Sequence, residues 1–246
     1  MRFAQAWVIA RHDMALFRRR KSILYVLIGF PLGVSIGFSA LVGYILSQGG
    51  SSATSYLFPV FVDAFSFWFV IGAASLPTAI AAYGIAGEKV EKSLEPLLAT
   101  PTSDGEILLG KVLSAFVPTI LAVWVGGVLY MGLIDLETRG VLGYLYFPNV
   151  GIAVTLFVLA PIACLFAIEV TVLISSRVTD VRGAQQASGV VFLPFIFLYV
   201  LGEVGPFPLD ATNSLYVAGA LAGLVLLLFA LNTRIFQREE ILTRWK

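Results

Sequence analysis

The chain has 246 residues, of which 59% are hydrophobic and 13% are charged, and its mean hydropathy is +0.92. This composition excludes a water-soluble globular protein, because apolar runs occupy most of the length and leave no room for a separate catalytic domain. The formal net charge is only +1, from 16 basic and 15 acidic residues.

The first 22 residues are predicted to form an amphipathic helix at the membrane interface. Phe3, Trp7, Ala10 and Met14 recur at helical spacing among arginines, which is the pattern of a helix lying in the interface plane. An ordinary basic segment flanking the membrane is the alternative. The stretch is too long and too mixed in composition for the charged region of a cleaved signal peptide.

Six apolar segments follow, each compatible with a membrane-spanning helix, since about 20 helical residues cross a hydrocarbon core of about 30 Å. They cover residues 23–46, 64–86, 112–134, 150–174, 187–202 and 213–233. Backbone groups in lipid must be satisfied internally, so we expect an all-α integral membrane protein. The whole chain, 1–246, is predicted to be a single transmembrane domain.

The basic residues predict the orientation of these segments. All the lysines and arginines except Arg139 fall in the segments on one side of the membrane. Basic loops face the cytosol, so both termini are expected there. An even number of spans agrees with this placement.

The most informative segment is the charged loop 87–106, between the second and third spans. Ser93 can cap a short helix whose Leu94, Leu97 and Leu98 share one face, and Thr100-Pro101 ends that helix. The run 103–106 (Ser-Asp-Gly-Glu) has the spacing of a capping box that starts the third span. A short amphipathic helix of this kind suits the groove of a partner protein. The alternative is a solvated loop that only connects two spans.

The order of residues in this loop resembles that of type-2 ABC transporter permeases. The match runs through G-E-K-x-E from Gly87, S-L-E-x-L-L-x-T-P from Ser93, and I-L-L-G-K from Ile107. The resemblance implies the transmembrane subunit of an ABC exporter in the plasma membrane, with the pathway formed by two permease copies, identical or related. It also implies that residues 88–101 dock onto a separate ATPase subunit. The docking residues implied are Glu88, Glu91, Leu94, Glu95, Leu97 and Leu98.

Under this interpretation the chain is not itself an enzyme and holds no cofactor, because ATP and Mg²⁺ belong to the partner. Residues 105–111 do have the G-x4-G-K spacing of a nucleotide-binding loop. However, Val112 stands where the Mg²⁺-binding hydroxyl is required, and no strand precedes the motif. We expect no nucleic-acid partner, and the transported substrate is not identified by any motif.

The fifth apolar segment is short and interrupted by Pro194, and a Gly/Pro-rich stretch, 202–210, follows it. Such interruptions often mark re-entrant backbone around a cavity, and type-2 permeases look similar here. A plain outer loop is the alternative.

Glu169 is the only ionisable residue well inside a predicted span, which makes it a candidate pathway residue. Alternatively it extends to the interface, because Arg177 lies two turns further on. An ATPase-independent channel or an ion-coupled carrier using Glu169 is the alternative function. An intramembrane enzyme would require a Ser-His pair, paired acids or a histidine cluster, which the spans lack. The lone Cys164 excludes an internal disulfide, and the sequence around His12 shows no cluster of metal ligands.

Overall fold

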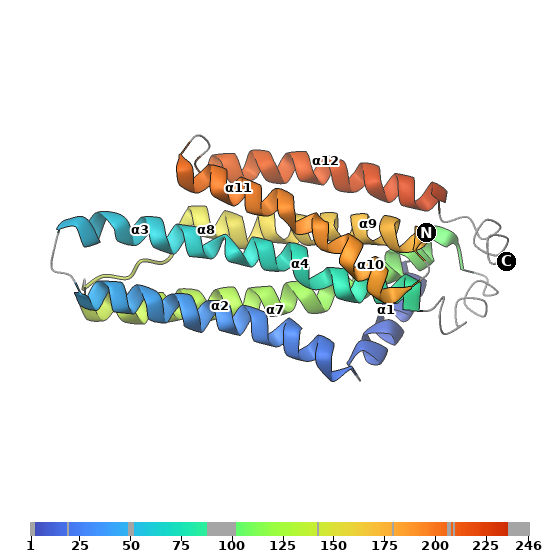
Figure 1. The fold of residues 1–246 in the computed structure, drawn as a ribbon, viewed down its shortest axis with the longest axis horizontal. Coiled ribbons are helices and arrows are strands. Elements are labelled where there is room, and N and C mark those ends of the chain that lie inside the picture. The colour runs from blue at the N-terminus through green and yellow to red at the C-terminus, as the bar shows by residue number, and fades with distance from the viewer. Residues whose placement is uncertain are drawn as a thin grey trace.

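The computed structural model describes residues 3–18, 20–48, 52–87, 102–141, 143–178, 180–205, 208 and 210–235. Every regular element within these ranges is a helix, and six helical segments are long and apolar enough to cross a membrane. The prediction of an all-α membrane protein with six spans is therefore confirmed. Figure 1 shows these helices running along one long axis.

The helices follow one another with short connections, and several spans are made of more than one element. Their bounds are α1 Phe3–Phe17, α2 Lys21–Gln48, α3 Ser52–Ser66, α4 Trp68–Ala82, the π-helix η1 Tyr83–Gly87, α7 Asp104–Val141, α8 Val150–Val154, the π-helix η2 Thr155–Leu159, α9 Ala160–Arg177, α10 Val181–Ser188, the 3-10 helix η3 Gly189–Phe192, α11 Leu193–Val204 and α12 Ala211–Ile235. The six spans are α2, α3–α4, α7, α8–η2–α9, α10–η3–α11 and α12.

The third span differs most from its predicted limits. Hydropathy places it at 112–134, whereas α7 begins at Asp104 and ends at Val141. At 1.5 Å per residue its 38 residues extend roughly 57 Å, which exceeds the hydrocarbon thickness. The helix α7 therefore extends beyond the apolar layer, with α1 packed near its start and the connection 143–149 bonded near its end.

The helix α4 lies at the centre of the bundle and packs against α9, α7 and α2. Of the most apolar stretch of the span α3–α4, 61% is buried, against 11% for α12, which packs mainly on α9. Figure 1 shows the same order, with α2 and α7 together on one side and α12 on the other. The apolar outer face of α12 is therefore available to lipid or to a second protein.

A close approach holds α2 against α7. A Cβ placed on Gly126 would lie 2.5 Å from the Cβ of Pro31, so only glycine fits between these helices. The Ser35 hydroxyl lies 2.6 Å from the carbonyl oxygens of both Pro31 and Gly126, and can donate to either. Donation to the Gly126 carbonyl oxygen links α2 directly to the backbone of α7 at this close approach.

The N-terminal helix α1 packs on α7 through a different face from the one that the apolar spacing indicates. The buried residues of α1 are Ala6, Ile9, Ala10, Asp13 and Phe17. Phe3 and Trp7 are instead 63% and 42% exposed. The small residues allow backbones to approach closely, and the larger apolar ones are left free to enter the membrane interface.

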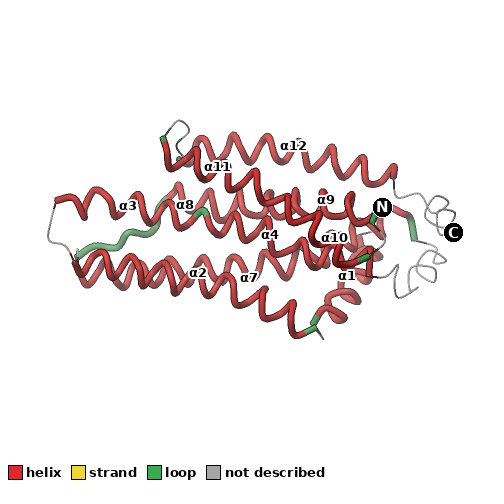
Figure 2. The backbone as a smooth tube through the Cα atoms, in the orientation of Figure 1, coloured by secondary structure: helices red, strands yellow, loops and turns green. Residues whose placement is uncertain are grey.

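At the end of the bundle opposite α1, a described connection of residues 143–149 joins α7 to α8 (Figure 2). Asp135 Oδ1 accepts hydrogen bonds from the backbone N–H groups of Tyr146 and Phe147, both at 2.9 Å. Asn149 then caps α8 by accepting from Gly151 N–H. Burial, and then the charge of Asp63, raise the pKa of Tyr146, whose hydroxyl donates to Asp63 Oδ1 at 3.2 Å.

The expectation of a re-entrant turn after the fifth span is wrong. Gly202 and Glu203 continue α11, which ends at Val204, with Gly205 in the left-handed conformation at φ 96°. Only Gly205 to Asp210 separate α11 from α12. That distance along the chain is too short for a segment that enters the membrane and returns. Asp210 caps α12 by accepting from Asn213 N–H at 2.8 Å.

Candidate functional site

The loop singled out by the sequence, 88–101, lies outside the described residues. The same holds for each docking residue expected within it, namely Glu88, Glu91, Leu94, Glu95, Leu97 and Leu98. The structure does describe both ends of this loop. One end is η1, which finishes at Gly87, and the other is the start of α7 at Asp104.

The first end is a π-helical turn, and its aromatic residue contacts the segment that links α1 to α2. The guanidinium carbon of Arg20 lies 3.7 Å from the ring centroid of Tyr83, and Arg20 also hydrogen-bonds the Tyr83 hydroxyl. The Phe17 ring meets the Tyr83 ring edge-on with centroids 6.1 Å apart. Single π-helical turns inside α-helices frequently occur at functional sites.

The second end is the capped N-terminus of α7. The Glu106 carboxylate accepts a hydrogen bond from the Ser103 backbone N–H at 2.9 Å. This is the reciprocal half of a capping box, so the predicted helix start at 103–106 is confirmed. Asp104 and Glu106 also place negative charge in the first turn, where the helix dipole favours it.

A buried lysine joins these two ends to α1. Lys111 Nζ donates to the carbonyl oxygen of Gly84 in η1 at 2.6 Å and lies 3.7 Å from Asp13 Oδ2 in α1. The Lys111 and Asp13 side chains are only 2% and 5% exposed. Each buried charge loses hydration worth several kcal/mol, so the ammonium and the carboxylate persist here because they face one another.

Close packing supports the same junction. A Cβ on Gly110 would lie 2.8 Å from both the Ala6 carbonyl oxygen and the Ile9 Cβ. Glycine at this position therefore lets α1 lie directly on α7, which brings Asp13 within reach of Lys111. We call the assembly of Asp13, Gly84, Lys111, Arg20 and Tyr83 the loop-root cluster.

The nucleotide-loop spacing at 105–111 belongs to the first turns of α7. The amides of Glu106 and Ile107 donate to the Ser103 carbonyl oxygen, and those further along bond within the helix, so this segment does not form the open loop that cradles a phosphate. Lys111, the lysine of this spacing, donates to the Gly84 carbonyl oxygen and faces Asp13. The segment therefore serves as the root of the loop.

Glu169 is 1% exposed and lies between α9 and α12. Its carboxylate oxygen Oε2 accepts a hydrogen bond of 2.6 Å from Asn232 Nδ2, and the same amide donates to the Glu169 carbonyl oxygen at 3.0 Å. The side chain therefore faces another helix of the same chain. Asn232, 63 positions further along, was not predicted as a site residue, and the only local signal was an amide near the end of an apolar run.

The sequence also failed to identify Asp13 and Lys111 as partners. Each is one of many charged residues near a predicted membrane boundary, where solvent exposure is the usual state. Cys164 is buried and unpaired. The His12 side chain is 72% exposed and lies 3.5 Å from Asp13 Oδ1. No cluster of three metal-ligating side chains occurs in the part of the chain that the structure describes.

The comparisons with known proteins agree with this architecture. The model of a family described as "ABC-2 family transporter protein" matches residues 7–217, from α1 into α12. No curated protein matches the chain. The matched region includes the loop, both of its ends and five complete spans.

Proposed function

The chain belongs to the ABC-2 transporter family, and from this premise we propose that it is the transmembrane subunit of an ATP-driven exporter in the plasma membrane. Membership makes it a multi-pass permease component of an ABC transporter. We further propose that both termini lie in the cytosol, because the described basic residues other than Arg139 gather at the end formed by α1 and the start of α7.

The observation that carries the coupling proposal is the loop-root cluster. Residues 88–101 begin and end at two elements that Lys111 connects through its hydrogen bond to Gly84. A force applied to the loop by a partner would therefore reach η1, α7 and α1 together. Buried, close-packed contacts transmit displacement between helices instead of absorbing it. This arrangement supports a role for 88–101 as the docking segment for an ATPase subunit, with the residues named for it above.

We propose that ATP and Mg²⁺ are bound by that partner and not by this chain. The helical state of 105–111 supports the assignment, since it removes the segment whose spacing suggested a phosphate loop. The chain then contributes the membrane pathway and has no catalytic residue of its own.

The pathway itself is proposed to form between two permease copies, either identical or related. Exposed apolar side chains on α11 support a protein-covered face, namely Leu193, Phe197 and Val200. Contiguous exposed apolar surface marks either lipid or protein contact. Glu169, which lies at the contact between α9 and α12, stays a candidate pathway residue.

Docking can be tested by reversing two charges in the loop. The chain is co-expressed with a candidate ABC ATPase subunit from the same genome, and the complex is isolated through a tag on the permease. We expect Glu91→Lys with Glu95→Lys to abolish ATPase recovery and ATPase stimulation, while the permease still inserts. The matched control, Glu239→Lys with Glu240→Lys, reverses the same number of charges in another segment proposed to be cytosolic. It should leave ATPase recovery and ATPase stimulation intact. Unchanged stimulation in the loop variant would exclude docking at 88–101.

A further inference from the structure

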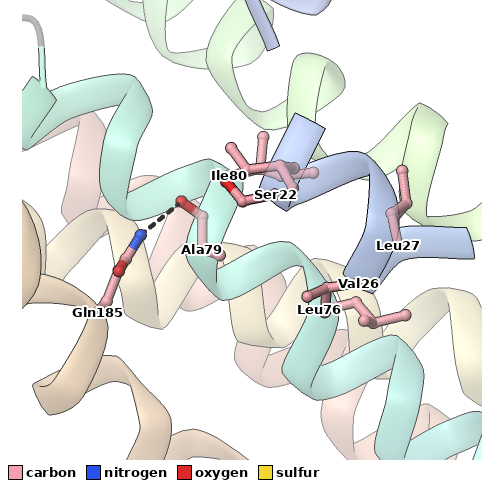
Figure 3. Close-up of a pocket in the computed structure, with 8 residues that line it drawn as sticks. Ser22, Val26, Leu27, Leu76, Ala79, Ile80 and Gln185 are labelled. Atoms are coloured by element: carbon pink, nitrogen blue, oxygen red, sulfur yellow. Dashed lines mark hydrogen bonds between the residues drawn. The ribbon is translucent and has the colours of Figure 1, made fainter. Parts of the chain in front are cut away.

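An open cavity of about 210 Å³ lies between the first turns of α2, the last turns of α4 and the helix α10 (Figure 3). Its lining residues come from these three elements, and they are Ser22, Ile23, Val26, Leu27, Leu76, Ala79, Ile80 and Gln185. Ser22 is the second residue of α2, and Leu27 lies about 7.5 Å deeper at the helical rise. The cavity therefore begins at the membrane boundary and extends into the apolar layer.

The walls change character with depth. Polar groups stand at the boundary, where Ser22 and Gln185 lie, and the deeper wall is formed by Val26, Leu27 and Leu76. Gln185 Nε2 donates to the Ala79 carbonyl oxygen at 3.5 Å, the outer limit for a hydrogen bond. Among the described residues Ala79 is the one hydrogen-bond partner of Gln185, so most of its amide capacity is free for a ligand.

Basic residues lie close along the chain to the residues that line the cavity. Lys21 precedes Ser22, and Arg182 lies one turn before Gln185 on α10, and both are exposed. Arg20 lies over Tyr83, one turn beyond Ala79 and Ile80. The nearest acid on α10 is Asp180, whose carboxylate caps that helix by accepting from Gly183 N–H at 2.7 Å. The segments that form the mouth of the cavity therefore carry more basic than acidic residues.

We propose that this cavity binds a phospholipid with an anionic headgroup, drawn from the leaflet at the α1 end of the bundle. An apolar cavity at hydrocarbon depth loses dispersion contacts if it stays empty. Lipid acyl chains surround the protein at that depth and can fill the cavity. Basic residues at a membrane surface attract anionic lipid by about 1 kcal/mol each, which corresponds to about fivefold in affinity. The headgroup phosphate lies among Lys21, Arg182 and the free amide of Gln185. A second copy of the chain is the competing occupant.

The test uses the full chain reconstituted in phosphatidylcholine vesicles that contain a minority of phosphatidylglycerol. The protein is extracted in mild detergent, and the retained lipid is identified by native mass spectrometry. We expect the wild type to retain phosphatidylglycerol in excess of its share of the vesicle. Ala79→Phe, which fills the cavity, should abolish that retention. Ala220→Phe on the exposed face of α12 is the matched control and should retain lipid as the wild type does.

The charge contribution is tested by Lys21→Gln with Arg182→Gln. This variant should lose the preference for phosphatidylglycerol by about fivefold for each base removed, while phosphatidylcholine retention stays unchanged. Arg177→Gln with Arg234→Gln removes equal charge from the same end without touching the lining, and should keep the preference. Equal retention by Ala79→Phe and Ala220→Phe would overturn the proposal. So would efficient disulfide formation between two copies of a Val26→Cys chain, which would assign the cavity to a second copy.

Neither measurement needs the ATPase subunit. Failure of lipid retention would therefore leave the proposed export function standing, and failure of docking at 88–101 would leave the lipid site standing.

Discussion

Lys111 in α7 donates a 2.6 Å hydrogen bond to the carbonyl oxygen of Gly84, and so connects the two helices from which the loop 88–101 emerges. The same ammonium faces Asp13 of α1, which makes one buried cation common to three elements. The residues are distant in sequence, yet they meet because α1 lies across α7 where Gly110 has no side chain.

Removing the cation should destabilise the chain more than removing the pair. Lys111→Met leaves Asp13 buried without its counter-charge, and we expect a loss of about 3 kcal/mol in unfolding free energy. Lys111→Met combined with Asp13→Asn should recover most of that loss, and Lys111→Arg should lose less than Lys111→Met. Thermal unfolding of the protein in detergent measures the difference. Equal stability of Lys111→Met and wild type would contradict a structural role for the pair.

The packing of α1 on α7 should depend on Gly110. A valine there places Cβ 2.8 Å from the Ala6 backbone oxygen, which cannot move without displacing the helix. We expect Gly110→Val to separate α1 from α7 and to increase hydrogen exchange of residues 3–17. Gly132→Val is the control in the same helix, because a Cβ at that position meets nothing within 4 Å. Equal hydrogen-exchange protection of α1 in Gly110→Val and Gly132→Val would argue against the contact between Gly110 and α1.

The proposed topology predicts which positions are accessible from outside the cell. A cysteine at Arg139 or Asp210 should react with an impermeant maleimide in intact cells, and one at Lys92 or Arg238 should react only after permeabilisation. The natural Cys164 is buried and gives little background. Labelling of Lys92→Cys from outside would refute cytosolic placement of the loop.

The role of Glu169 can be separated into anchoring and transport. Glu169→Gln keeps an oxygen that accepts from Asn232, so assembly should be normal. Glu169→Leu leaves the Asn232 amide buried without that acceptor, which should lower the unfolding free energy by about 1–3 kcal/mol. A pathway role predicts that Glu169→Gln lowers ATPase stimulation at unchanged stability. Native stimulation in Glu169→Gln would remove this residue from the pathway and leave it as a link between α9 and α12.

Several features could be predicted from the sequence because they depend on residues close together in the chain. The six spans follow from the length of each apolar run, and the start of α7 follows from the spacing of Ser103 and Glu106. The resemblance of the loop to type-2 permeases was likewise carried by a contiguous segment, and the family match is consistent with it. Local order along the chain was sufficient for each of these inferences.

The tertiary structure decided which polar groups meet. Asn232 contacts Glu169 from 63 positions away, and Lys111 reaches a carbonyl oxygen 27 positions before it. Hydropathy reports whether a segment enters the membrane, but it does not say which face of a helix meets which neighbour. That choice depends on where small residues such as Gly110 and Gly126 let backbones approach, and on which buried charge then finds a partner.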